Sequence, residues 1–132
     1  MTPFDLIGRP YRLGGDFIKH DAGDCLSLAR FVLSYYGINT PEPQRDWYRR
    51  LRRGDTSVFL EELTKWGEET ADLECGVVAL CRAENGYGMA VYFEHGWLNF
   101  QSFGESVVRW SPTKHLQACG FYCQQKSNYV KP

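Results

Sequence analysis

The chain has 132 residues, of which 43% are hydrophobic and 15% aromatic, so it can bury a core of ordinary single-domain size. Its formal net charge of -1 excludes a general nucleic-acid binder, because such domains carry a basic excess. No apolar run approaches the roughly 18 residues that cross a bilayer, and the start, MTPFDLIGRP, lacks the charged head and apolar stretch of a signal peptide. We therefore expect one domain over residues 1–132, with no membrane span and no secretion signal.

The first part of the chain contains an irregular segment followed by a helix. GRPYRLGGDFIKHDAG is rich in glycine and polar residues, which is typical of a loop. In DCLSLARFVLSYYG, apolar side chains recur at intervals of three and four, the spacing of one helix face. Gly37 fits the position just past the end of that helix. The sequence therefore predicts an amphipathic helix that begins near Cys25 and stops at Gly37.

Two shorter helices are predicted between residues 44 and 67. The second runs through SVFLEELTKW, with Asp55 or Thr56 as its cap and Gly67 as its stop. The first covers RDWYRRLRR, where a helix would present Arg45, Arg49, Arg50, Arg52 and Arg53. The simplest interpretation of this basic cluster is a solvated helix face, and the alternative is a contact for phosphate or an acidic partner.

The second part of the chain reads as strands. From Gly76 onward come short runs of β-branched and aromatic residues, namely GVVALC, GMAVYF, WLNFQS, SVVRW and CGFYC. Glu94, His95 and Gly96 fit a hairpin turn between the second and third runs. Helices followed by strands indicate the α+β class. We expect an N-terminal helix packed on an antiparallel sheet of about five strands.

Cys25 is the most informative position for chemistry, because it lies where the irregular loop ends and the apolar helix begins. Backbone N–H groups and the helix dipole stabilise a thiolate there, and the thiolate is the nucleophilic form of cysteine. Asp24 opposes this effect unless it caps the helix. From position alone, a small residue facing the core is the simpler interpretation of Cys25.

A nucleophilic cysteine also needs a base, normally a histidine held by a third polar group. The chain offers His20 in the lead-in loop, His95 in the predicted turn and His115 after SPTK. None is predicted on a strand that faces the start of the helix. Each is more simply interpreted as an exposed loop histidine, and His20 is the nearest to Cys25 in sequence.

The stretch LIGRPYRLGGDFIKHDAGDCLSLARFVLSYYGI resembles the opening signature of NlpC-type cell-wall peptidases. In that papain-like superfamily, a G-x-P-Y segment precedes a loop, then D-C and an apolar helix. The resemblance implies a papain-like α+β fold in which Cys25 occupies the position of the nucleophile. Members of the family cleave peptide bonds in the stem peptides of bacterial cell walls.

The chain resembles one branch of the family more closely than the others. The variant D-C-L-x-L-x-R resembles the branch encoded beside phage tail genes and in gene transfer agents, and its matched residues are Asp24, Cys25, Leu26, Leu28 and Arg30. Looser similarities are the inserted helices with Asp46 and Trp47, the strand CGVVAL, and VVRWSP before a last aromatic strand. Together these similarities cover most of the chain.

The chain departs from the family at the position of the catalytic histidine. The family pattern resembles H-x-G-I-Y at the start of the second strand, and GMAVY aligns so that Gly88 stands in place of the histidine. The orienting residue falls in the next strand, where Asn99 is the match. Glycine cannot accept a proton, and nucleophile and base act as a unit, so we expect peptidase turnover to be nearly abolished.

The cysteines permit a different hypothesis. Five cysteines without a secretion signal do not indicate a disulfide framework, and at least one thiol should be free. Separate core residues are the simplest interpretation, and a small metal-binding module is the alternative. The even spacings that favour the alternative place two pairs on single strand faces: Cys75 with Cys81, and Cys119 with Cys123.

The sequence therefore predicts a structural or assembly component of a tailed-phage tail tip or baseplate, without a cofactor, on a degenerate NlpC-type fold. Its expected partners are other tail proteins, and its expected location is the virion after synthesis in the bacterial host cytoplasm. The alternative is an active cysteine endopeptidase or amidase that binds and cleaves peptidoglycan during phage entry. A residue that replaces the missing histidine as the base would favour the active peptidase over the structural component.

Overall fold

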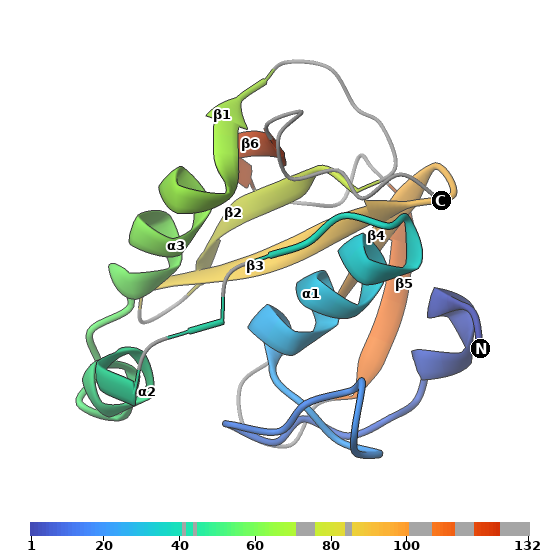
Figure 1. Cartoon of the computed structure of the whole chain (residues 1–132), viewed down its shortest axis with the longest axis horizontal. Helices are drawn as coiled ribbons and strands as arrows, with labels where there is room; N and C mark the ends of the chain where they lie inside the picture. The colour runs from blue at the N-terminus through green and yellow to red at the C-terminus, as the bar shows by residue number, and fades with distance from the viewer. Residues whose placement is uncertain are drawn as a thin grey trace.

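The structure is a computed structural model that describes residues 1–40, 42–43, 45–70, 76–83, 86–100, 107–112 and 118–124 (Figure 1). Of residues 45, 83, 86, 119 and 124 it describes the backbone alone. Helices lie against one face of an antiparallel sheet, so the predicted α+β class is confirmed. None of the described helices is long and apolar enough to cross a bilayer.

The longest helix, α1 (Cys25–Tyr35), is capped at both ends by the residues beside it. Asp24 is the N-cap, and its carboxylate accepts the Ser27 N–H at 2.9 Å. In return the Ser27 hydroxyl accepts the Asp24 N–H at 3.1 Å, which completes a capping box. Gly37 follows the helix with φ of 75°, a conformation that costs glycine little. The predicted helix and its glycine stop are confirmed.

Two inserted helices follow, α2 (Arg45–Arg52) and α3 (Val58–Trp66), as the sequence predicts. The N-cap of α3 is Ser57, so the prediction of Asp55 or Thr56 was wrong. Asp55 instead stabilises the turn before the helix, because its carboxylate accepts the Ser57 N–H at 3.2 Å. Trp47 anchors α2 by donating its indole N–H to the Val58 carbonyl at 3.1 Å.

The sheet contains all five predicted strands and one more, in the order β1-β6-β2-β3-β4-β5. A turn at Glu94 and His95 joins β3 to β4, and both residues have the positive φ that a tight hairpin turn requires. The extra strand is β1 (Gly67–Glu69), which pairs with β6 at the edge of the sheet. The five predicted strands are β2 (Val78–Ala83), β3 (Gly86–Phe93), β4 (Gly96–Phe100), β5 (Val108–Pro112) and β6 (Ala118–Gln124).

Side chains of the central strands alternate between two buried clusters, one on each face of the sheet. Helices α1 and α3 cover the first face, and α2 lies outside them (Figure 1). The first cluster takes Met89, Val91 and Phe93 from β3 and Leu98 from β4. The second cluster takes Ala90, Tyr92 and Trp97. This alternation fixes the face of every other residue on β3 and β4.

Candidate functional site

Cys25 is the first residue of α1, and its side chain lies between the helix and the sheet. The residue is only 9% exposed. Burial, and next the negative charge of Asp24, raise the pKa of the Cys25 thiol far above its usual range. The Met89 backbone N–H on β3 donates toward the sulfur and lowers that pKa by a smaller amount. At neutral pH the group is therefore a thiol, and a thiol is a poor nucleophile.

Asp24 joins three segments around this thiol. Its carboxylate accepts the Ser27 N–H at the start of α1 and the Gly14 N–H of the lead-in loop at 3.0 Å. The Tyr48 hydroxyl of α2 interacts with the same carboxylate. Burial raises the pKa of Asp24 above its usual range, although these hydrogen bonds oppose the shift. Asp24 thus holds the loop, α1 and α2 together beside Cys25.

Two tyrosines complete the surroundings of Cys25, and neither was predicted as a site residue. Burial raises the pKa of Tyr11 and of Tyr48, and the charges of Cys25 and Asp24 raise both further. Neutral phenols donate hydrogen bonds, and they do not act as bases near neutral pH. Tyr11 is the tyrosine of the G-x-P-Y segment, which was a usable signal. Tyr48 lies on the inserted helix α2, and no sequence motif near it indicated that it would lie beside Cys25.

No described histidine takes the role of base. The side chains of His20 and His95 are exposed, and within the described residues neither makes a hydrogen bond or an ion pair. His95 lies in the turn after Phe93, and Phe93 is four residues, or about 13 Å, along β3 from Met89, which contacts the thiol, so His95 is far from Cys25. His115 lies outside the described residues.

The positions that match the family's histidine and orienting residue lie on the far face of the sheet. Gly88 alternates with Met89, and Asn99 alternates with Leu98, so both face the second cluster while Cys25 faces the first. A Cβ added at Gly88 would meet no described atom within 4 Å. The Asn99 amide donates to the Ser111 hydroxyl at 3.4 Å. The structure therefore does not bring these three positions together.

The structure describes the side chains of two of the four cysteines in the hypothetical metal site, Cys81 and Cys123. Cys81 and Cys123 pack against the second cluster, so they share a face. Cys81 pairs with Ala118 and Val78 with Tyr122, so the two thiols lie four strand positions, or about 13 Å, apart. One zinc ion, with sulfur ligands at about 2.3 Å, cannot bind both. Cys75 and the Cys119 side chain lie outside the description, and the described residues hold no group of three or more potential metal ligands.

The arginine cluster divides into a structural part and an exposed part. Arg50 binds Asp55 at 2.8 Å and Glu61 at 2.7 Å, which ties α2 to α3. Arg49 and Arg52 are exposed and form no ion pair within the described part of the chain. This division agrees with the simpler interpretation, a solvated helix face from which Arg50 forms partly exposed ion pairs.

Comparisons with protein-family models, with curated proteins and with solved structures gave no significant match. The NlpC-type resemblance therefore stays a prediction from the sequence motif.

Proposed function

We propose that the chain is a structural or assembly component of a tailed-phage tail tip or baseplate, built on an NlpC-type fold whose peptidase site no longer works. The NlpC-type fold rests on the resemblance of residues 6–38 to the family signature, and the phage context rests on the resemblance of the D-C-L-x-L-x-R variant at residues 24–30 to the tail-associated branch. In this proposal the protein is made in the bacterial host cytoplasm, becomes part of the virion, and acts by binding other tail proteins.

The state of the Cys25 thiol carries the proposal. The side chain is buried, and burial together with Asp24 raises its pKa, so the thiolate population at neutral pH is very small. The phenols of Tyr11 and Tyr48 interact with Cys25 and Asp24. Among the described residues, no histidine does so. A cysteine peptidase needs a thiolate and a proton acceptor in contact, and general-base catalysis contributes about 10²- to 10⁴-fold to the rate.

The second candidate is an active cysteine endopeptidase or amidase that cleaves peptidoglycan stem peptides. One observation favours it: the helix start and the Met89 N–H both direct positive charge at the sulfur, as a working nucleophile requires. This function needs a base from a residue outside the described part of the chain, such as His115.

Digestion of purified peptidoglycan separates the two functions. The intact chain and its Cys25→Ala variant are incubated with cell walls and with released stem peptides, and products are identified by mass spectrometry. We expect no difference between the two proteins. Fragments that the intact chain releases and the variant does not would overturn the proposal and establish the peptidase.

The assembly role has its own test. Tails purified from the phage that encodes the chain are analysed by quantitative mass spectrometry. We expect the chain in a fixed ratio to the other tail proteins. Its recovery in the cell lysate but not on purified tails would contradict the assembly role, whatever the digestion result.

A further inference from the structure

Strand β5 forms one edge of the sheet, and only its first residue is covered on the outer side. The Val108 N–H donates to the Arg9 carbonyl at 2.9 Å, and the Gly8 N–H donates to the Val108 carbonyl at 2.8 Å. Backbone groups alternate in direction along a strand, so the N–H and C=O of Trp110 point to the same outer side. Within the described residues, no hydrogen bond joins these two groups to a neighbouring segment.

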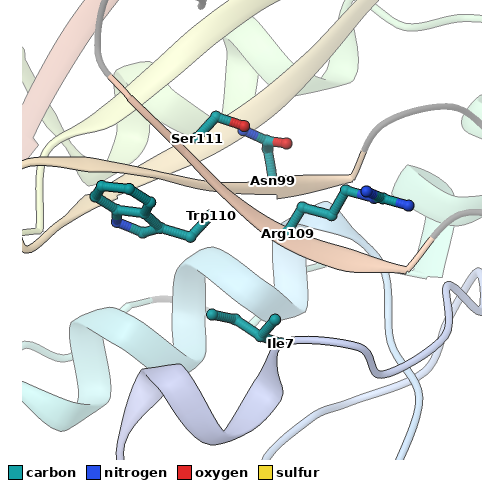
Figure 2. A pocket seen from close by; sticks show the side chains of 5 residues that line it. All are labelled: Ile7, Asn99, Arg109, Trp110 and Ser111. Carbon is teal, nitrogen blue, oxygen red and sulfur yellow. The ribbon is translucent and has the colours of Figure 1, made fainter.

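An open concavity of about 500 Å³ follows this uncovered part of β5 (Figure 2). Figure 2 shows the Trp110 side chain on one side of the β5 ribbon and Asn99 and Arg109 on the other. The described lining residues are Ile7, Asn99, Arg109, Trp110 and Ser111. The concavity thus offers two different chemistries, one on each side of an open strand edge.

The first side is apolar. The Trp110 indole N–H donates to the Phe93 carbonyl at 2.9 Å, which holds the ring against the sheet and leaves the residue 37% exposed. Ile7 is 44% exposed beside it, and Phe4 packs edge-on against the Phe93 ring at 4.8 Å. Large apolar side chains exposed together are typical of a protein-binding surface.

The second side is polar and carries the positive charge of Arg109. Arg109 is exposed and forms no ion pair with any carboxylate of the described chain. It lies directly opposite Asn99 in the strand pairing, and the neighbouring Ser111 hydroxyl already accepts the Asn99 amide. A carboxylate that arrives on this side would meet the exposed Arg109 guanidinium, and guanidinium groups bind carboxylates through paired N–H groups.

We propose that the outer edge of β5 binds an extended segment of another protein, which adds a short strand to the sheet. The Trp110 N–H and C=O supply the main-chain hydrogen bonds of this strand addition. Side chains of an added strand alternate between the two faces. The segment therefore alternates apolar residues, which pack on Ile7 and Trp110, with acidic residues, which reach Arg109.

A second copy of the chain does not fit this edge. Two β5 strands paired antiparallel about Trp110 would place Val108 of each copy opposite Pro112 of the other. The Val108 N–H and C=O are already engaged by Gly8 and Arg9, and proline has no N–H to donate. A short segment of a different protein can end before the covered part of the edge.

The binding edge does not depend on whether Cys25 is catalytic, and only the identification of the partner as a tail protein rests on the proposed function. Peptide binding and peptidoglycan digestion are separate measurements on the same protein. Failure of the proposed binding edge can therefore be distinguished from failure of the proposed function.

The test is selection from a displayed random heptapeptide library against the intact chain, against Arg109→Glu, and against Arg52→Glu. The last variant makes the same charge change at an exposed arginine of α2. We expect the intact chain and Arg52→Glu to enrich peptides that alternate apolar and acidic residues. The synthesised peptide should bind Arg109→Glu at least about tenfold more weakly, and N-methylation of its central amides should weaken binding to the intact chain by a similar factor.

Three results would overturn the proposal. The first is the absence of any enriched peptide for a folded intact chain. The second is enrichment without alternation, or enrichment that Arg109→Glu leaves unchanged. The third is a dimer in sedimentation experiments that Arg109→Glu dissociates, which would make a second copy of the chain the occupant of this edge.

Discussion

Replacing Asp24 with alanine tests the junction beside Cys25. The carboxylate accepts the N–H groups of Gly14 and Ser27 at 3.0 and 2.9 Å, and the residue is 1% exposed. Water cannot easily reach the Ser27 N–H, which is buried, whereas Gly14 is exposed and can bind water instead. The Asp24→Ala variant therefore leaves the buried Ser27 N–H unpaired and removes the cap of α1.

The magnitude follows mainly from the Ser27 N–H. An unpaired buried N–H costs about 1–3 kcal/mol, so this one group costs roughly 2 kcal/mol. Loss of an N-cap alone costs about 0.5–2 kcal/mol, which sets the lower limit. We expect Asp24→Ala to lower the free energy of unfolding by about 2 kcal/mol, a considerable part of the 5–15 kcal/mol that is typical of a domain of this kind.

Urea unfolding followed by circular dichroism measures the change. Asp16→Ala is the matched control, because Asp16 also accepts one backbone N–H, that of Ile18 at 2.9 Å, but in an exposed turn. The control should change the free energy of unfolding by less than about 1 kcal/mol. An Asp24→Ala variant as stable as this control would refute the view that Asp24 holds the three segments together.

The remaining predictions concern proton binding, strand packing and thiol reactivity. Burial raises the pKa of Asp24 in the folded state, so the additional stability that comes from protonating Asp24 is complete below the unfolded pKa of about 3.9 and is lost as pH rises through the folded value, while the hydrogen bonds of the carboxylate remain. The free energy of unfolding of the parent should therefore fall, relative to Asp24→Asn, as pH increases from 4; a difference independent of pH would show an unshifted pKa. Gly88→Ala should stabilise the protein by about 0.5–1 kcal/mol in thermal unfolding, because the added methyl group enters open space. Gly96→Ala should instead destabilise it by about 1–3 kcal/mol, because that methyl group meets an indole ring and a carbonyl oxygen of β5; equal effects at the two glycines would contradict the packing. Iodoacetamide at pH 8 should modify Cys25 at least about tenfold more slowly than the half-exposed Cys123, as read by peptide mass mapping, and faster modification of Cys25 would mean an accessible thiolate.

Most of the fold could be predicted because local signals agree with the final structure. The spacing of apolar residues in α1, the cap at Asp24 and the stop at Gly37 are all local, and each lies where the sequence indicates. The five runs of β-branched and aromatic residues all became strands. Two elements were missed: η1 (Pro3–Leu6), a single short turn of helix, and β1. The sequence GEE has no strand preference, and β1 exists because β6 pairs with it.

The site was less predictable than the fold, because its members come from distant segments. Asp24 and Cys25 could be found from the loop-to-helix transition. The contact of Cys25 with Met89 depends on how α1 packs across β3, and the approach of Tyr48 depends on where the inserted helix folds back. The face on which Gly88 lies depends on strand alternation, which an alignment of motifs does not contain.

The position of β6 has a consequence for how the chain folds. Strands β2 to β5 are neighbours in both sequence and space, so their pairings close short loops and can form early. β6 is the last of the described strands, yet it fills the gap between β1 and β2 and brings Gly67 opposite Gln124. Until β6 inserts, the edge of β2 that it later covers is open, and open edges recruit other chains. A nascent chain that stalls before residue 118 would therefore be a partly built sheet prone to aggregation, and rapid completion of synthesis would protect it.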